Sequence, residues 1–264
     1  MLKVFKIAGL HVDNNALPVL PTSDLDRLIA QMPGIRSWFD PTRGADVFAA
    51  GQILDRASGN ILDALFPADQ YAWKFSTFPN STAPAFLLPN SPTPYQSDKF
   101  QMNATEFSIV AVARWSADDG VGDIIGAPTT QEASDISVRL TYSINDLIVI
   151  YQGITGIGNR LQISPADVGL STFRQAAGII MATFSVSKGL TLWFNGVQGK
   201  VNTTDLRALT NTAVQLCGYS TAVSNGFGGH LGHVLVFDVD LSSLAYAGYR
   251  NAMNRALMGH YGIV

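Results

Sequence analysis

The chain has 264 residues, of which 47% are hydrophobic and 14% are charged, and its formal net charge is −3. This balance excludes a disordered chain, and the length is sufficient for one large globular domain. The small negative charge provides no basic surface, which argues against nucleic acid as a partner. Cys217 is the single cysteine, so no disulfide forms within the chain, and its apolar neighbours predict a buried thiol.

Residues 1–7 alternate loosely between apolar and polar side chains, and Leu2, Val4, Phe5 and Ile7 supply the apolar surface. We weigh two interpretations: an edge strand of the domain's own sheet, and an assembly arm that pairs with a neighbouring subunit. The segment lacks the long apolar run of a signal peptide, and no later stretch has the length of a membrane-spanning helix. We therefore expect synthesis in a reducing cytoplasm and no membrane insertion.

Residues 22–32 predict a short helix that begins after Ser23, a suitable N-cap residue, and ends at Pro33-Gly34. Its apolar residues recur at positions i, i+3, i+4 and i+7, namely Leu25, Leu28, Ile29 and Met32. This stripe either packs on the domain that follows or docks the protein to a partner. We predict that residues 1–34 form an N-terminal arm and helix, and that residues 35–264 form one domain.

The next part of the chain opens with a predicted strand at residues 35–40. Between residues 42 and 101, Gly, Pro, Asn and Ser interrupt short apolar pieces. Five prolines in residues 78–95 predict an extended loop, which either carries a binding function or covers an edge strand.

A series of apolar or alternating segments then predicts strands at residues 107–115, 136–142, 147–151 and 160–163. Strands at intervals of roughly 8–12 residues, with turn residues between them, are typical of a β-sandwich.

The clearest pattern is a three-strand meander at residues 179–201. Strands at residues 179–186 and 190–194 are joined by a Ser-Lys-Gly turn, and Asn195-Gly196 then leads into a third strand at residues 197–201. Asn-Gly between alternating apolar residues strongly indicates a hairpin, because both residues tolerate a positive φ.

The C-terminal residues predict a second helix with Asp240 as its N-cap. One face of this helix would be a stripe of mostly small residues that packs closely on a sheet, made of Leu241, Leu244, Ala245, Gly248, Ala252, Ala256 and Leu257. Arg250 and Arg255 would then point outward.

The meander resembles the hairpin of the laminin-G and concanavalin A-like jelly-roll superfamily, through Leu192-Trp193-Phe194-Asn195-Gly196. Residues 214–218 and 227–237 are similar to two later strands of that family, and the Gly259-His260-Tyr261-Gly262-Ile263 ending resembles the tails of jelly-roll domains in phage structural proteins and bacterial surface proteins. The resemblance implies an all-β fold: an antiparallel two-sheet jelly-roll sandwich with a short N-terminal and a C-terminal helix.

The resemblance also implies a role. We predict a non-enzymatic structural protein on the surface of a bacteriophage particle, as a capsid decoration or a tail-associated protein, anchored through its N-terminal arm. Its location would be the virion, and its partners would be other virion proteins and copies of itself, with a trimer as the expected assembly. The alternative is a glycan-binding lectin or adhesin that recognises a bacterial surface polysaccharide, in which loop aromatics such as Tyr95 and Phe227 stack on sugar rings.

The sequence supplies no catalytic residues. Glycoside hydrolysis needs a pair of carboxylates, and the glucanase branch of the superfamily takes them from a Glu-x-Asp-x-x-Glu strand. Glu106 and Glu132 are the only glutamates, and neither belongs to such a pattern. His230 and His233 are three residues apart on a predicted strand, so they would face opposite sides and make poor co-ligands for a metal.

Calcium is the ion that the sequence fits best, since several branches of the superfamily bind it. Asp118, Asp119 and Asp123 offer three carboxylates in a predicted loop, and calcium takes six or more oxygen ligands. The competing interpretation is an acidic turn in solvent. We favour that interpretation and predict no bound cofactor.

Overall fold

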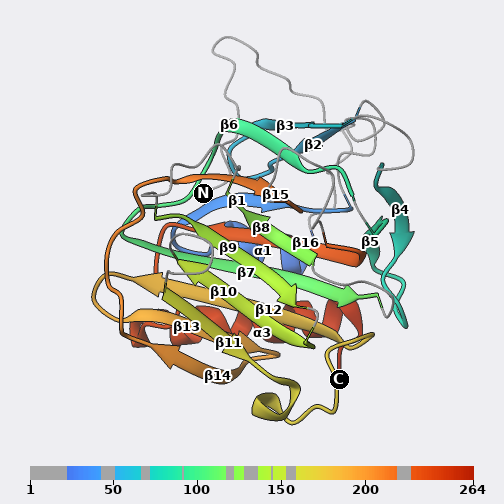
Figure 1. The fold of residues 1–264 in the computed structure, drawn as a ribbon. Coiled ribbons are helices and arrows are strands. Elements are labelled where there is room, and N and C mark those ends of the chain that lie inside the picture. The colour runs from blue at the N-terminus through green and yellow to red at the C-terminus, as the bar shows by residue number, and fades with distance from the viewer. Residues whose placement is uncertain are drawn as a thin grey trace, which may run out of the picture.

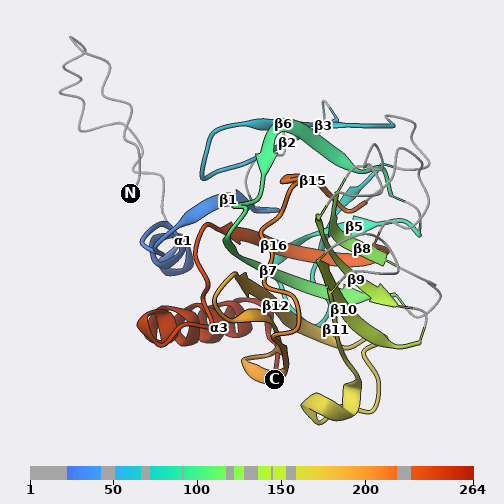
Figure 2. The ribbon, with the colours of Figure 1, turned by 60° about the vertical axis from the view of Figure 1, so that its left-hand side comes forward.

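The computed structural model describes residues 23–42, 51–66, 72–90, 92–116, 122–127, 136–143, 145–152, 159–218 and 227–264. In this part of the chain, two antiparallel sheets pack face to face, and helices α1 and α3 lie on the side of one sheet that faces away from the other sheet (Figures 1 and 2). The fold is the predicted all-β jelly-roll sandwich with a short N-terminal and a C-terminal helix.

The first sheet, here called sheet A, has the strand order β14-β13-β12-β7-β16-β5-β4, with β1 pairing on β16. Its strands are β14 (Val197–Asn202), β13 (Gly189–Phe194), β12 (Ala177–Ser185), β7 (Glu106–Trp115), β16 (Gly229–Phe237), β5 (Pro84–Leu88), β4 (Lys74–Thr77) and β1 (Ile35–Phe39).

The second sheet, sheet B, has the order β11-β10-β9-β8-β15-β6-β3-β2. Its strands are β11 (Asn159–Ile163), β10 (Leu147–Gln152), β9 (Val138–Ser143), β8 (Gly122–Gly126), β15 (Ala213–Leu216), β6 (Tyr95–Gln101), β3 (Ile61–Ala64) and β2 (Gln52–Leu54).

The central strands of sheet A are buried on both faces. On β7, Ile109 and Ala111 point toward sheet B, whereas Val110 and Val112 point toward the helices, and all four are fully buried. Because side chains alternate along a strand, a strand covered on both sides is apolar at nearly every position. This explains the continuous apolar run at residues 107–115.

The meander forms as predicted. Strands β12 and β13 pair with Ile180 opposite Phe194, and the turn that follows has positive φ angles of 50° at Asn195 and 79° at Gly196. The side chain of Asn195 also accepts the backbone N–H of Ile179 at 2.7 Å, which ties the turn to β12. The strand predicted at residues 35–40 is β1, and it pairs with β16 near the end of the domain.

The proline-rich segment at residues 78–95 is not a continuous loop, so that prediction is wrong in part. Pro84–Leu88 forms β5, in which Ala85, Phe86 and Leu88 are buried. Pro84 is the first residue of this strand, a position at which a missing backbone N–H is tolerated.

Helix α1 (Asp24–Ala30) begins at the predicted N-cap, since the Ser23 hydroxyl accepts the backbone N–H of Asp26 at 3.0 Å. Leu25, Ile29 and Met32 are buried in the apolar cluster between sheet A and the helices. The apolar stripe therefore packs on the sandwich, as one of the two interpretations held. The division between residues 34 and 35 stays a prediction, and residues 1–22 lie outside the described part of the chain.

The C-terminal helix begins later than predicted. Oδ1 of Asp240 accepts the backbone N–H and the hydroxyl of Ser242 in a turn, a short 3₁₀ segment η3 (Leu244–Tyr246) follows, and α3 runs over Ala247–Tyr261. The face that packs on sheet A is consequently different, and its buried residues are Met253, Leu257 and Tyr261. The predicted stripe is therefore only partly right: Leu241 and Leu257 are buried, whereas Leu244, Ala245 and Gly248 are exposed.

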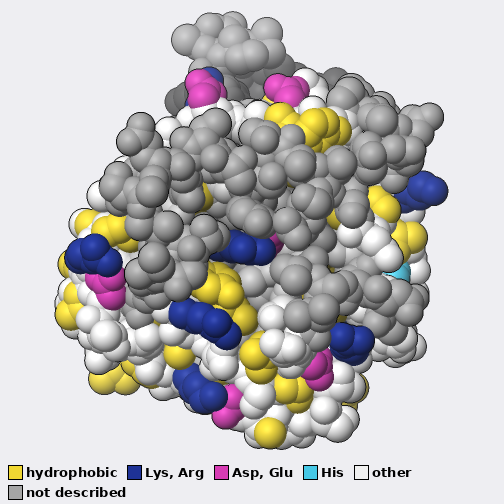
Figure 3. Space-filling view, in the orientation of Figure 1, with side chains coloured by type: hydrophobic (Ala, Val, Ile, Leu, Met, Phe, Trp, Pro, Cys, Tyr) yellow, Lys and Arg dark blue, Asp and Glu magenta, His cyan; other side chains and the backbone are white. Residues whose placement is uncertain are grey.

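The two arginines of α3 also differ from each other. Arg255 is exposed, as predicted, but Arg250 donates a hydrogen bond to the carbonyl of Leu241 at 2.6 Å and lies 4.6 Å from the ring centroid of Trp193. Its guanidinium therefore covers the edge of the core. On the face drawn in Figure 3, acidic and basic side chains are interspersed.

Candidate functional site

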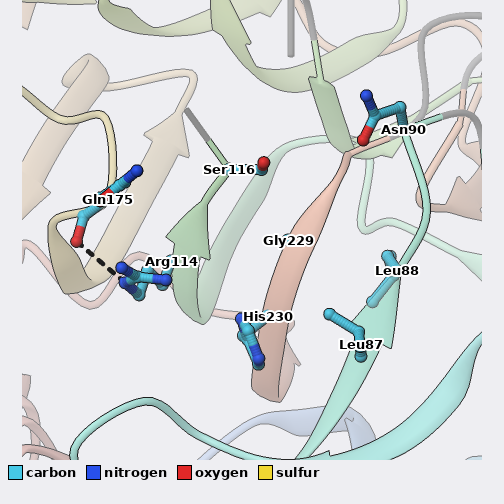
Figure 4. A pocket seen from close by; sticks show the side chains of 8 residues that line it. All are labelled: Leu87, Leu88, Asn90, Arg114, Ser116, Gln175, Gly229 and His230. Atoms are coloured by element: carbon cyan, nitrogen blue, oxygen red, sulfur yellow. Dashed lines mark hydrogen bonds between the residues drawn. The ribbon is translucent and has the colours of Figure 1, made fainter. Parts of the chain in front are cut away.

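A pocket of about 230 Å³ opens at one rim of sheet A, where β5 and β7 end and β16 begins. Five of its lining residues have polar side chains and two are leucines. The lining consists of Leu87, Leu88, Asn90, Arg114, Ser116, Gln175, Gly229 and His230 (Figure 4). We refer to it as the rim pocket.

The strand register places basic side chains in one row across this rim. His230 pairs with Arg114 on one side and with Leu87 on the other, and Leu87 pairs with Lys74 of β4. Directly paired residues point to the same face of a sheet. The row therefore carries a guanidinium, an imidazole and an ammonium group on one face, with an exposed leucine among them.

Arg114 is half-buried, and its position is fixed by one hydrogen bond. Its Nε donates to the backbone carbonyl of Gln175 at 3.0 Å, the contact drawn as a dashed line in Figure 4. Among the residues that the structure describes, no carboxylate pairs with Arg114. A guanidinium has five N–H donors, so the outer ones are free to contact a bound molecule.

His230 is a neutral hydrogen-bonding group in this pocket. Burial, and then the positive charge of Arg114, lower the pKa of His230 from its ordinary value. Since the ordinary pKa of histidine is about 6.5, the imidazole is uncharged at pH 7. It offers one donor and one acceptor, which suits hydroxyl groups.

Two backbone features shape the pocket. Gly229 has φ +128°, and a Cβ atom there would lie 2.3 Å from the carbonyl oxygen of Arg114, so only glycine allows β16 to start this close to β7. Gln175 is a non-glycine residue with φ 59°. Such a conformation costs roughly 1–3 kcal/mol and is concentrated at functional sites. The backbone conformation of Gln175 also orients its carbonyl oxygen toward Nε of Arg114.

The sequence analysis missed the rim pocket. One signal was available: Arg114 is the only charged residue between Phe107 and Trp115, in an otherwise apolar strand. A lone charged residue in a buried strand indicates either a strand end or a site. The pairing of Arg114 with His230 and Leu87 depends on the sheet register, which the sequence does not contain.

The structure places one of the three calcium candidates. Asp123 lies in β8 and is fully buried, with Oδ1 2.6 Å from Nε of Arg139. Burial raises the pKa of Asp123 to about 6, against the lowering effect of Arg139. Asp123 thus lies in a strand and not in the expected loop. Asp118 and Asp119 lie outside the described residues, so the favoured prediction of an acidic turn without calcium is not tested for them.

The aromatic residues predicted to stack on sugars do not lie in exposed loops. Tyr95 is 2% exposed and Phe227 is 0% exposed, and both belong to the core between the sheets. The ring of Tyr95 packs edge-on against Trp73, and that of Phe227 packs against Tyr142. The prediction for these two residues is therefore wrong, because both rings fill the ends of the sandwich.

A second polar cluster is buried between α1, β1 and α3. Asp26, Asp40 and His233 bring their ligand atoms within 4.8 Å of one another, which is the donor set of a divalent metal site. However, Arg56 hydrogen-bonds to both carboxylates and stacks 3.7 Å from the ring centroid of Trp38. A cation is thus already present between the two carboxylates, and we interpret the cluster as a structural ion network.

His233 contributes a buried imidazole to this network. The Tyr261 hydroxyl accepts the backbone N–H of His233 at 3.0 Å and lies within hydrogen-bond distance of Nδ1, at 2.6 Å. Nε2 then faces Oδ1 of Asp40 at 3.5 Å, which is too long for a good hydrogen bond. Burial lowers the pKa of His233 to about 4, although the carboxylate of Asp40 acts in the opposite direction.

The prediction that His230 and His233 face opposite sides of their strand is wrong, because the strand register shifts between Leu231 and Val234. Both rings lie on the helix side of sheet A, that of His230 against Phe78 in the rim pocket and that of His233 against Tyr261 in the ion network. Cys217 is fully buried, as expected for a packing residue. The assembly-arm residues Leu2, Val4, Phe5 and Ile7 lie outside the described part of the chain. No helix within the described residues has the length and apolar character needed to cross a membrane.

Comparison with known proteins gives no match to a family model and no match among curated sequences. Solved structures do match. The chain is similar to the botulinum neurotoxin serotype D binding domain, with 12% identity, a TM-score of 0.54, and coverage of 83% of this chain and 51% of that one.

Two further neurotoxin structures that match this chain name a sugar or a ganglioside in their titles. One is the serotype D ligand-binding domain in complex with N-acetylneuraminic acid, at 11% identity and a TM-score of 0.55, covering 87% of this chain and 53% of that one. The other concerns type C neurotoxin, whose cell entry depends on two ganglioside molecules, at 9% identity and a TM-score of 0.52, covering 85% and 52%.

These matches support the sandwich fold. At such low sequence identity they do not show that the function is the same. The chain spans about half the length of the binding domains it resembles. None of these three structures comes from a phage particle, so the predicted virion role and the trimer gain no support from them.

Proposed function

We propose that this protein is a glycan-binding domain and that the rim pocket is its binding site. The observation that carries the proposal is the lining of the pocket. Asn90, Ser116 and His230 supply neutral donors and acceptors for hydroxyl groups, and Leu87, with 36% of its surface exposed, offers an apolar wall to the C–H side of a sugar ring.

The fold comparison supports the same proposal. Of the three solved structures described above, two are binding domains by their titles, one of them in complex with N-acetylneuraminic acid, and the third names an interaction with gangliosides in its title. Since this chain spans only about half of those domains, the likeness raises the expectation of glycan binding without locating a site.

The pocket is better suited to binding than to hydrolysis. A glycosidase needs two carboxyl groups flanking the bond, and none of the eight lining residues is Asp or Glu. That the protein is not an enzyme, and that its natural partner is a bacterial surface polysaccharide, remain proposals. A place on a virus particle is compatible with glycan binding but has no support of its own.

A glycan array probed with the full chain, followed by titration of the strongest ligand, tests the proposal. Leu87→Ala should weaken binding about tenfold by removing the apolar wall, since fully burying a leucine contributes about 2 kcal/mol and this one is buried only in part. Leu206→Ala is the matched control, because Leu206 is a 39% exposed leucine outside the pocket. Absence of any binding glycan, or equal losses in both variants, would contradict the proposal.

A further inference from the structure

We propose that the sugar bound in the rim pocket is acidic and that Arg114 binds its carboxylate. This inference rests on the proposed function, because it names the class of sugar that the same pocket takes. It concerns a property that the shape of the pocket does not determine, namely the charge of the ligand.

The first step is the uncompensated charge of the pocket. None of the residues lining it is acidic, and within the described part of the chain Arg114 forms no ion pair. Two more deeply buried arginines of this protein are paired with carboxylates: Arg56 with Asp26 and Asp40, and Arg139 with Asp123. Arg114 is half-buried at the pocket wall and has no carboxylate partner among the described residues, so an anionic ligand would complete its charge-assisted hydrogen bonds.

The second step is the geometry of the guanidinium. The hydrogen bond from Nε to the Gln175 carbonyl orients the guanidinium and leaves its outer N–H groups for a ligand. The outer N–H donors of an arginine form a planar fork that matches the two oxygens of a carboxylate. The strained backbone of Gln175, with φ 59°, positions this carbonyl, so the conformational cost is met in folding and not in binding.

The third step is the number of charges. His230, directly opposite Arg114, is neutral at pH 7, and Lys74 is exposed at the far end of the row, outside the pocket lining. The pocket wall therefore holds one fixed positive charge surrounded by neutral polar groups. This arrangement suits a ligand that carries one negative charge and several hydroxyls.

The fourth step is size. A cavity of about 230 Å³ is smaller than the ~300–1,000 Å³ typical of sites for drug-sized ligands. It accommodates one monosaccharide and leaves the rest of a chain in solvent. The expected ligand is thus a terminal or branching acidic sugar, of the uronic acid or sialic acid type.

The test is a titration of the full chain with matched pairs of sugars. The probes are the methyl glycosides of glucuronic acid and of N-acetylneuraminic acid, the uncharged methyl ester of each, and glucose 6-sulfate. We expect at least one acid to bind about tenfold or more tightly than its ester, because a charge-assisted hydrogen bond contributes about 1.5–3 kcal/mol. The preference should weaken at high salt.

Variants at one position assign the effect. Arg114→Gln should reduce the affinity for the acid by about ten- to a hundredfold and reduce the affinity for the ester by a much smaller factor, so that the preference for the acid is lost. Arg114→Lys keeps the charge without the fork and should be intermediate. Arg255→Gln is the control, because Arg255 is an exposed arginine outside the pocket. Far-UV circular dichroism confirms that each variant is folded.

The outcomes separate this inference from the proposed function. Equal binding of acid and ester, or an unchanged preference in Arg114→Gln, would overturn the inference, while a neutral glycan lost in Leu87→Ala would leave the proposed function standing. Tighter binding of glucose 6-sulfate than of either acid would overturn the carboxylate in favour of a sulfate ester. If neither these probes nor any array glycan binds, the proposed function fails and the inference fails with it.

Discussion

Acidification should destabilise this protein through His233, and the size of the effect follows from its burial. The pKa of His233 is about 4 in the folded protein, against about 6.5 for an ordinary histidine. Between these two values the unfolded chain binds a proton that the folded protein does not bind. Stability therefore falls as the pH falls through this window.

The magnitude is about 3 kcal/mol, since the pKa differs by about 2.5 units and each unit is worth about 1.4 kcal/mol. The other groups of the network are Asp26, Asp40, Arg56 and His260, and burial lowers the pKa of His260 as well, which adds to the same trend. Asp123 acts in the opposite direction: its pKa is raised to about 6, so the folded state gains protons first and stability rises on acidification.

Because these contributions oppose each other, the assay compares two proteins and not two pH values alone. Urea unfolding of the natural protein and of His233→Gln is measured from pH 7 to pH 4. The natural protein should lose about 3 kcal/mol more than the variant over this range. Equal losses would refute the assignment of the titration to His233. If the variant does not fold, an NMR titration of the natural protein should show no protonation of His233 above pH 5.

Three further predictions concern stability. Arg139→Ala removes the partner of the fully buried Asp123 carboxylate and should lower the free energy of unfolding in urea by about 3–5 kcal/mol. If the ion pair is the cause, adding Asp123→Asn must recover part of this loss. Gly229→Ala should lower the melting temperature and weaken glycan binding, since its Cβ meets the backbone of β7. Gly248→Ala, in helix α3 with open space around it, should lower neither, because alanine favours a helix; similar losses in the two variants would argue against a tight approach of β16. Ile29→Ala should cost about 2–5 kcal/mol, because this side chain of α1 is fully buried, and a loss below about 1 kcal/mol would mean that α1 is not part of the core.

Local sequence patterns predicted the turns and the first helix correctly, because neighbouring residues determine these elements. Asn195-Gly196 requires two positive φ angles, and the structure has them. The stripe from Leu25 to Met32 predicted a packed helix, and Ser23 caps it. Such features depend on residues a few positions apart, so the sequence is sufficient to predict them.

The wrong predictions concern residues whose structure depends on contacts with residues far away in the sequence. Pro84 starts a strand because Thr77 lies opposite it in β4. Asp240 has the chemistry of an N-cap but closes a turn that precedes the helix, which changes the face that α3 presents. Tyr95 follows a run of prolines and looked exposed, yet the sandwich closes over it.

The candidate site was beyond sequence reasoning for the same reason. Leu87, Arg114 and His230 come from three strands that meet only through the register of sheet A. The ion network likewise joins Asp26 and Asp40 to a histidine near the end of the chain. A lone arginine in an apolar strand was a signal for one of these groups, but its neighbours could not be deduced.

The central claim is that the rim pocket binds a glycan. The most direct measurement is a two-dimensional ¹H–¹⁵N NMR titration of the full chain with the strongest ligand from the array. If the rim pocket is the binding site, the largest amide shifts fall on its lining, at Asn90, Arg114, Ser116 and His230, and they saturate together. Shifts confined to another part of the protein, with these amides unchanged, would contradict it.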